Sequence, residues 1–237
     1  MDITISFFDI SIYTFYYNHM KRTLYHGSES IINKPIFGIG NIHNDYGLGF
    51  YCCSNIGLAK EWASRKNGFG YVNKYSIRDD RLNILDLTKE PYGDVLIWTA
   101  LLMNNRTIDK SLTDAYPREL DYLKQHYLVD VNKYDVIVGY RADDSYFKFP
   151  ESFVKSDITI ESLRKIYKAG NLGKQYVLIS KHAFDLLHFE ESLETNKESK
   201  TSYYDRKSKA DKAYNDLINE DRYKKGTRLR DLVMDND

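Results

Sequence analysis

The segment LYHGS at residues 24–28 places an imidazole, a residue without a side chain and a hydroxyl side by side. It comes after residues that favour a β-strand, so these three groups fall where the strand ends. Two interpretations are open. In the plainer one, the segment is a turn that contains a histidine. In the other, the backbone at Gly27 forms one wall of a ligand pocket and His26 lies at its floor.

Two later segments bear on this choice. YGLGFY at residues 46–51 contains a glycine-rich turn that leads into a short apolar strand, and QYVLIS at residues 175–180 is predicted to be a buried strand. Each segment alone is a weak signal, because single histidines are more often structural and Gly-x-Gly before an aromatic strand is usually a turn. The order and spacing of the three segments give them more weight together than separately.

The composition limits the class of protein without naming it. A chain of 237 residues is long enough for one sizeable core, or for one domain with an appendage. Its 21 tyrosines and 11 phenylalanines favour many strands. The formal net charge is zero, with 34 residues of each sign, so bulk electrostatics does not favour a nucleic-acid or acidic-membrane partner. A local basic patch stays open.

The cysteines and histidines predict no metal site. Cys52 and Cys53 are adjacent, and neighbouring cysteines rarely form a disulfide with each other, so we expect two small apolar side chains on a strand. His126, His182 and His188 have no metal-like spacing from carboxylates or cysteines. The scarcity of other cysteines favours a reducing, cytoplasmic location.

The composition along the chain predicts three parts. Residues 1–20 are apolar and aromatic, but no positive segment precedes them, and Asp2 and Asp9 interrupt the run. We therefore expect an N-terminal extension, which is either an extra element that packs on the domain or an over-extended start, and not a signal peptide or a membrane helix; no membrane partner is expected. A domain is predicted at 21–190. Residues 191–237 are dense in both charge signs and predict a helical tail that is solvated or orders on a partner.

The local patterns predict a mixed α+β domain. Trp62 is expected in the core, because it shares an apolar helical stripe with Leu58 and Ala59. The predicted strands are 21–26, 49–54, 69–77, 82–87, 133–140, 145–149 and 175–180. The predicted helices are 55–67, 92–104, 111–127, 159–170 and 181–189.

Taken together, HGS at residues 26–28, YGLGFY with the helical segment GLAKEWA behind it, and QYVL resemble the motifs of the ADP-ribosyltransferase superfamily. The similarity is to its diphtheria-toxin and poly(ADP-ribose) polymerase branch. GYRADD at residues 139–144 is similar to a segment of an uncharacterised bacterial family whose members are often encoded in toxin–antitoxin-like operons. The resemblance covers residues 22–190 in outline. It implies an α+β fold with a split β-sheet core and flanking helices, and NAD as the substrate.

The resemblance also implies roles in NAD binding. His26 would donate to a ribose hydroxyl of the adenosine half, and Tyr51 would stack on the nicotinamide ring. Gly27 would let that ring approach the main chain, because it has no Cβ, and Ser28 would contact the carboxamide. Arg141 is a candidate for a bidentate contact to the pyrophosphate.

Gln175 departs from the family pattern. The ribose becomes positively charged as nicotinamide leaves, and in the superfamily a glutamate at this position usually contacts the 2′-hydroxyl. Gln175 brings no charge, and losing one such electrostatic contact costs about 10²–10³ in rate. Asp143 and Asp144 are turn formers in the plainer interpretation. In the alternative, one of them supplies the missing carboxylate or activates an acceptor nucleophile.

The resemblance therefore predicts an NAD-dependent ADP-ribosyltransferase that acts as a bacterial toxin or defence effector. It would break the nicotinamide–ribose bond and transfer ADP-ribose to a macromolecule, either a protein or a nucleic acid. A neutralising antitoxin protein is the partner expected from the operon context, with the charged tail as its candidate surface. The alternatives are an NAD glycohydrolase, a phosphate-transferring enzyme that modifies RNA, a catalytically inactive module that binds NAD or ADP-ribose, and a structural interaction protein.

Overall fold

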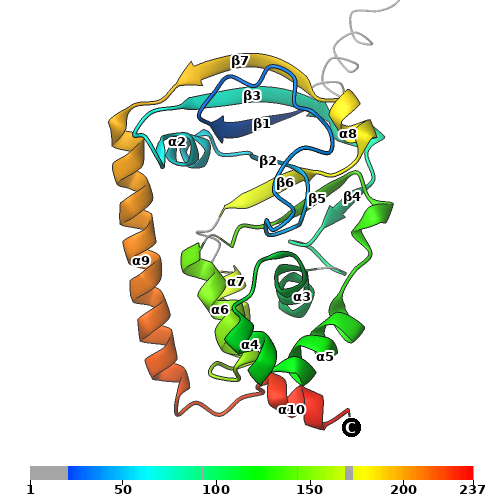
Figure 1. Ribbon diagram of the computed structural model, residues 1–237, viewed down its shortest axis with the longest axis vertical. Coiled ribbons are helices and arrows are strands. Elements are labelled where there is room, and N and C mark those ends of the chain that lie inside the picture. Colours follow the sequence, from blue (N-terminus) through cyan, green and yellow to red (C-terminus); the bar gives the residue numbers. More distant parts are fainter. Residues whose placement is uncertain (1–20, 92, 143, 169–172, 237) are drawn as a thin grey trace, which may run out of the picture.

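The structure is a computed structural model that describes residues 21–91, 93–142, 144–168 and 173–236. Figure 1 shows its ribbon. The expected N-terminal extension, residues 1–20, lies outside the described residues, and so does Asp143.

The centre of the fold is a seven-stranded sheet in the order β4-β5-β6-β2-β1-β3-β7. Its strands are β1 (Lys21–Ser28), β2 (Phe50–Cys53), β3 (Tyr71–Arg78), β4 (Ile84–Asp86), β5 (Val136–Tyr140), β6 (Lys174–Leu178) and β7 (His188–Glu194). β4 and β5 are parallel, and the other neighbours are antiparallel. With its helices, this mixed sheet confirms the predicted α+β class.

The sheet has two halves, β4-β5-β6-β2 and β1-β3-β7, which meet where β2 pairs with β1. β1 pairs with β3 along its whole length, and β2 pairs with β6 over four residues. Between β1 and β2, the register within the described residues holds one pair, Tyr25 with Cys53. Beyond that pair, residues 26–28 of β1 still pair with β3, but no register partner on β2 is found for them within the described residues. The segment HGS therefore lies on the strand, at the point where the two halves part.

Helices cover both halves (Figure 1). They are α2 (Ile56–Ser64), α3 (Val95–Asn105), α4 (Lys110–Ala115), α5 (Pro117–Tyr127), α6 (Asp144–Val154), α7 (Ile160–Lys168), α8 (Lys181–Asp185), α9 (Lys197–Asp221) and α10 (Leu229–Met234), with short 3₁₀ turns at Asp79–Arg81 and Val131–Lys133. α2 lies beside β1, α3 to α7 lie beside the β4-β5-β6 half, and α9 runs along the side of both. Among the helices of the described residues, none is both long and apolar enough to cross a membrane.

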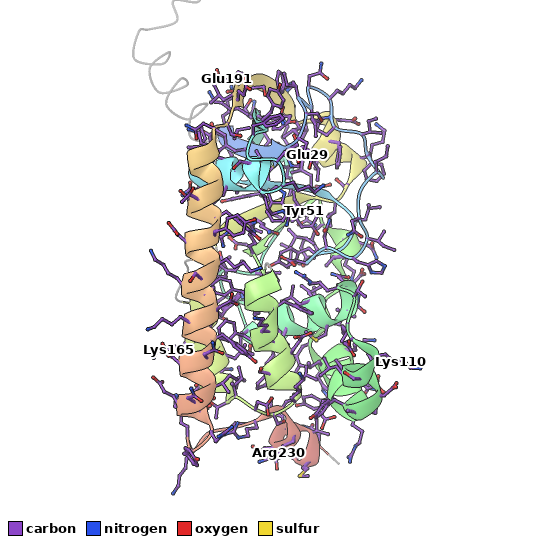
Figure 2. All side chains as sticks on the ribbon, turned by 60° about the vertical axis from the view of Figure 1, so that its left-hand side comes forward. Glu29, Tyr51, Lys110, Lys165, Glu191 and Arg230 are labelled. Carbon is purple, nitrogen blue, oxygen red and sulfur yellow. The ribbon has the colours of Figure 1, made fainter. Side chains whose placement is uncertain are left out.

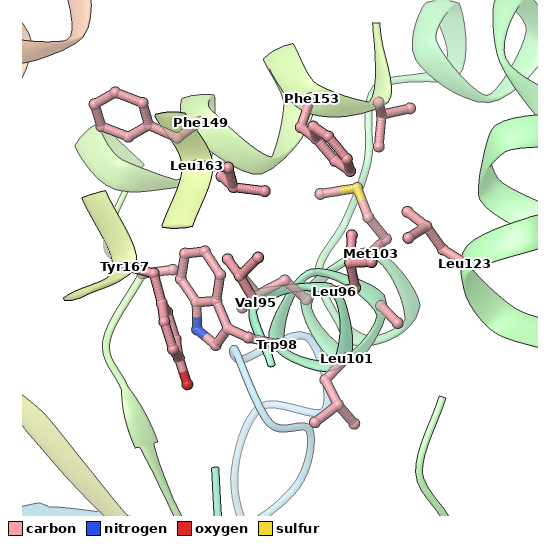
Figure 3. Close-up of a cluster of buried hydrophobic side chains, with 14 of the residues drawn as sticks. Val95, Leu96, Trp98, Leu101, Met103, Leu123, Phe149, Phe153, Leu163 and Tyr167 are labelled. Carbon is pink, nitrogen blue, oxygen red and sulfur yellow. The ribbon is translucent and has the colours of Figure 1, made fainter. Parts of the chain in front are cut away.

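The larger core surrounds α3. The helix is apolar on all sides, so it is buried all round, as its sequence predicts. Figure 3 shows Trp98, Leu101 and Met103 of α3 packed among side chains of α5, α6 and α7. The indole Nε1 of Trp98 donates to the carbonyl oxygen of Tyr140 at 3.1 Å. This bond ties the core helix to the end of β5.

Two predictions of local structure are wrong. Residues 145–149 were expected to form a strand, but they belong to helix α6. Phe149 and Phe153 are one helical turn apart and both are buried, which a five-residue window does not reveal. The predicted helix 181–189 ends at Asp185, because residues 188–194 form the edge strand β7.

The charged segment after β7 packs on the body of the protein. α9 has 25 residues, and its buried residues Tyr203, Ala210 and Leu217 are seven apart, which is two helical turns. Arg206 forms an ion pair with Glu61 of α2 at 2.9 Å, and both side chains are largely buried. The polar face of α9 is therefore solvated, while its narrow apolar stripe lies on α2 and α6.

Candidate functional site

A cavity of about 570 Å³ opens where the two halves of the sheet part. Its lining comes from β1, β2, the loop between them, α2, the start of β6 and the segment after β5. Five residues singled out from the sequence line it: His26, Gly27, Tyr51, Arg141 and Gln175. The fold thus brings residues that are up to 149 positions apart in the chain to one site.

The other three candidates are not placed in this lining. Ser28 lies outside it, and its hydroxyl donates to the Ser30 carbonyl and accepts from Asn73 Nδ2. Asp144 begins α6, but its side chain lies outside what the structure describes, as does the whole of Asp143. The structure therefore groups five of the eight candidates.

His26 fills the gap between β1 and β2. Its Nδ1 lies 2.7 Å from the carbonyl oxygen of Tyr51, and its ring stacks on Phe50 with centroids 4.4 Å apart. A carbonyl oxygen only accepts, so Nδ1 carries the proton. Burial lowers the pKa of His26 below its ordinary 6.5, and the hydrogen bond to Tyr51 partly opposes this shift. The imidazole is neutral at pH 7, so Nε2 is an acceptor.

Tyr51 is held by the glycine turn that precedes it. Its hydroxyl donates to the Gly47 carbonyl at 2.7 Å and accepts from the Tyr46 backbone N–H at 3.0 Å. Burial raises the pKa of Tyr51 far above its usual value, so the phenol stays neutral. Figure 2 shows Tyr51 in the upper half of the molecule, below Glu29 and well above Lys110 and Lys165. These bonds fix the orientation of its ring in the cavity.

Gly27 is required by the helix behind the strand. A Cβ added at Gly27 would overlap the carbonyl oxygen of Ala59 and lie 2.8 Å from the backbone nitrogen of Ala63. Both are backbone atoms of α2, so neither can rotate away. The missing side chain therefore lets α2 pack directly on β1, a role that the sequence did not suggest. Gly27 is buried and also contributes to the cavity lining.

Gln175 presents a buried oxygen to the site. Its Oε1 is enclosed and has no hydrogen-bond partner among the described residues. The residue faces Cys53 on β2 and Gly139 on β5 in register. A buried acceptor without a donor is costly, so this oxygen is suited to accept from a bound ligand.

The two cysteines have different surroundings. Cys52 is in the core, as expected, whereas Cys53 is half-buried and lines the cavity. The Cys53 thiol donates to the Asn55 carbonyl at 3.2 Å, and burial raises its pKa. The thiol is therefore protonated and weakly nucleophilic at neutral pH.

The cavity has an excess of positive charge. Arg65, Arg106, Arg141 and Lys174 line it, and Asp45 is the one acid among the described lining residues. The Asp45 carboxylate accepts from Arg106 Nη1 and from the Ala142 backbone N–H, each at 2.9 Å. Burial raises the pKa of Asp45, while these two contacts oppose the shift. The balance favours an anionic ligand.

Trp62 lies at the cavity, not in the core. Its side chain is 38 % exposed and lines the cavity. The guanidinium carbons of Arg65 and Arg141 lie 3.9 and 4.3 Å from the centre of its ring. The prediction of a core tryptophan is therefore wrong, because Ala59 of the same stripe is buried against β1 while Trp62 lies at the cavity.

Asn73 and Asp45 were not found from the sequence. Asn73 is fully buried on β3, where its side chain binds Ser28, the Ser30 carbonyl and the Ile32 backbone N–H. It thereby fixes the turn after β1. A single amide inside an alternating strand carries no sequence signal of such a role. Asp45 sits in a polar loop, where an acid is ordinary.

No cluster of three or more potential metal-ligating side chains occurs in the part of the chain that the structure describes.

The site therefore belongs to an α+β protein with a cation-rich cavity at the junction of two half-sheets. A family model described as "Protein of unknown function (DUF3990)" matches residues 22–189, and the chain belongs to this family. The match runs from β1 into β7 and includes every described residue that lines the cavity. No curated protein and no solved structure matches the chain.

Proposed function

We propose that the protein is an NAD-dependent ADP-ribosyltransferase with the split-sheet fold of that superfamily. The supporting observation is the meeting of His26, Tyr51 and Gln175 in one cavity. Each comes from a different one of the three sequence segments that resemble the superfamily. The cavity, of about 570 Å³, is within the range of about 300–1,000 Å³ that is usual for small-molecule sites.

In this proposal the dinucleotide spans the gap between β1 and β2. Nicotinamide stacks on Tyr51, and its carboxamide pairs with the main chain at Gly27. A ribose hydroxyl of the adenosine half donates to Nε2 of His26, because Nδ1 already donates to the Tyr51 carbonyl. The direction of this bond is the reverse of the one expected from the sequence. The cationic groups of the cavity face the pyrophosphate.

The proposed reaction breaks the bond between ribose C1′ and the nicotinamide nitrogen. The bonding electron pair leaves with nicotinamide, and the ribose becomes an oxocarbenium ion that an acceptor nucleophile then attacks at C1′. Oε1 of Gln175 accepts a hydrogen bond from the 2′-hydroxyl and orients the ribose. Without a charge at this position the reaction is slow unless a carboxylate is supplied elsewhere, and we propose Asp143 or Asp144 for that role.

The biological role that we propose is that of a cytoplasmic bacterial toxin or defence effector. Its acceptor is a protein or a nucleic acid, and an antitoxin protein is its partner. This part of the proposal rests on the resemblance of GYRADD to the toxin-like family.

A second candidate is a module that binds NAD or ADP-ribose without cleaving it. It is favoured by the absence of a free carboxylate among the described lining residues, where Asp45 is engaged by Arg106 and Ala142. Gln175 then acts only as a hydrogen-bond acceptor.

Incubation with adenylate-labelled NAD and a cell lysate tests the proposal. Nicotinamide release together with labelled macromolecule supports transfer. Free labelled ADP-ribose alone indicates a glycohydrolase, and NAD binding without release indicates the binding module. The matched variants are Gln175→Ala, in the cavity, and His188→Ala, an exposed residue of β7 outside it. Equal nicotinamide release by both variants would count against the assigned site.

A further inference from the structure

Two arginines that come from separate elements lie over the ring of Trp62. Trp62 is in the last turn of α2, Arg65 follows the end of that helix, and Arg141 follows the end of β5. The guanidinium carbons lie 3.9 and 4.3 Å from the ring centre, so they are no further apart than the sum of these distances, 8.2 Å. One indole ring thus holds two positive charges close together at the cavity surface.

This arrangement is suited to a ligand with two adjacent negative charges. Each guanidinium is attracted to the aromatic face, but the two cations repel each other. The N–H groups of a guanidinium bind phosphate oxygens bidentately, and two guanidinium groups this close to one ring can meet neighbouring phosphates. Asp45, the one acid among the described lining residues, is bound to Arg106 and also interacts electrostatically with Arg141, so one carboxylate is shared by two of the cavity's cations. A bound anion would relieve the repulsion between Arg65 and Arg141.

The helix that carries Trp62, α2, packs against both β1 and α9. α2 packs on β1 through Ala59 and Ala63, which face Gly27. On its other side, Glu61 of α2 is paired with Arg206 of α9. The helix that carries Trp62 is therefore held between the sheet and α9, which fixes the backbone from which the ring projects.

We propose that Trp62 is a positioning residue that holds Arg65 and Arg141 as a clamp for the diphosphate of a nucleotide. The ligand class is a nucleoside diphosphate ester. That this ester is NAD rests on the proposed function, whereas recognition of the diphosphate follows from the clamp itself. Neither Trp62 nor Arg65 had been assigned a ligand role from the sequence.

Calorimetric titration with inorganic pyrophosphate and with NAD, at low and high salt, tests the clamp. Trp62→Leu is expected to weaken pyrophosphate binding about tenfold, because the stacking that orders both guanidiniums is lost. Trp62→Phe keeps an aromatic face and is expected to restore most of the affinity. Arg65→Gln is expected to weaken binding and to reduce its salt dependence. Arg81→Gln removes one exposed positive charge outside the cavity lining and is the matched control.

The outcomes separate the clamp from the proposed function. Pyrophosphate binding that Trp62→Leu weakens and Trp62→Phe restores supports the clamp, even if NAD does not bind and the proposed function fails. NAD and pyrophosphate binding that both Trp62 variants leave unchanged overturns the clamp and leaves the proposed function standing. Absence of pyrophosphate binding by the unaltered protein also overturns the clamp. Thermal unfolding of each variant checks that it is folded. If Trp62→Leu does not fold, Arg65→Gln serves as the second variant.

Discussion

Gln175 lies on β6 opposite Cys53 and Gly139, with its side-chain oxygen enclosed and without a partner among the described residues. An amide oxygen accepts a hydrogen bond from a hydroxyl much as a carboxylate does, but it adds no negative charge beside a developing cation. The identity of this side chain therefore controls the proposed chemistry more than it controls binding.

We predict that Gln175→Glu accelerates nicotinamide release by about 10²–10³, because the carboxylate stabilises the positively charged ribose. The measurement is nicotinamide release from NAD at saturating concentration, with affinity followed by calorimetry. Gln175→Ala should bind NAD more weakly and release less nicotinamide than the unaltered protein, because the acceptor that orients the ribose is lost. Equal rates for Gln175→Glu and the unaltered protein would contradict this role.

The protonation state of His26 predicts a pH dependence of NAD affinity. Its folded-state pKa is lower than 6.5, so the imidazole stays neutral and Nε2 stays an acceptor as the pH falls through 6.5. NAD affinity should therefore be constant above 6.5 and decline only at more acidic pH, when Nε2 becomes protonated. A titration series from about pH 8 to about pH 5 measures this. A decline that begins above 6.5 would show that Nε2 is not the acceptor.

The same shift affects stability. The unfolded chain takes up the proton near pH 6.5, whereas the folded chain resists it. The stability due to neutral His26 is therefore complete above 6.5 and decreases as the pH falls towards the folded-state pKa.

Single residues were predictable where a short segment marked them. His26, Tyr51 and Gln175 belong to three recognisable segments, and the fold brings them together. The prediction that Trp62 lies in the core was wrong, because an apolar helical stripe does not show whether its residues pack in a core or line a cavity. Asn73 could not be found from the sequence, since its role depends on contacts with a turn more than 40 residues away.

α9 is attached to the body by a buried carboxylate at its end. Asp221 is fully buried and accepts from the Thr159 backbone N–H at 2.5 Å, from the Thr159 hydroxyl at 3.1 Å and from the Ser162 hydroxyl at 2.6 Å. Thr159 and Ser162 lie at the start of α7, so this carboxylate joins the two helices.

We predict that Asp221→Ala lowers the free energy of unfolding by about 3 kcal/mol, because it leaves buried donors without an acceptor. For a chain of this size the unfolding midpoint should fall by about 6–12 °C, which thermal denaturation measures. Asp216→Ala is the control, since Asp216 is exposed and pairs with Lys212 one turn earlier in the helix. Its effect should stay within about 0.5 kcal/mol. Equal effects of the two substitutions would contradict the proposed attachment.

The contact between α2 and β1 gives a second prediction on stability. Gly27→Ala should lower the free energy of unfolding by about 2 kcal/mol or more, because its Cβ would overlap backbone atoms of α2. Thermal denaturation measures the loss. Since the displaced helix carries Trp62, NAD affinity should fall as well. A variant with unchanged midpoint would show that α2 does not pack on Gly27 as described.

The uniformly apolar helix α3 and the short strands β2 and β4 were predicted, whereas helix α6 and the edge strand β7 were not. α3 is apolar over all its turns, so both its type and its burial follow from the sequence. β7 is charged and pairs at the sheet edge, where Glu190 bonds to Lys21 at 2.8 Å, so its strand character depends on a partner far away in the chain. The stripe of α9 has one residue in seven, too sparse to distinguish from a solvated helix.

The molecule as a whole is neutral, yet its cavity is not. The chain carries 34 charges of each sign, whereas four cationic side chains and one acid are found among the described lining residues. Net charge therefore gives no indication of the ligand, and only the fold shows where the charges gather. The cavity also lies where the two half-sheets separate, a feature that depends on the β1–β2 register and that the strand patterns do not contain.

Calorimetric titration of NAD into the unaltered protein and into two histidine variants tests the central proposal most directly. The proposal predicts that the unaltered protein and His188→Ala bind one NAD with similar affinity. Thermal denaturation first verifies that His26→Ala is folded. This variant should then bind NAD at least about tenfold more weakly, because the hydrogen-bond acceptor Nε2 of His26 is lost. Absence of NAD binding by the unaltered protein, or equal affinities of the two variants, would contradict the proposal.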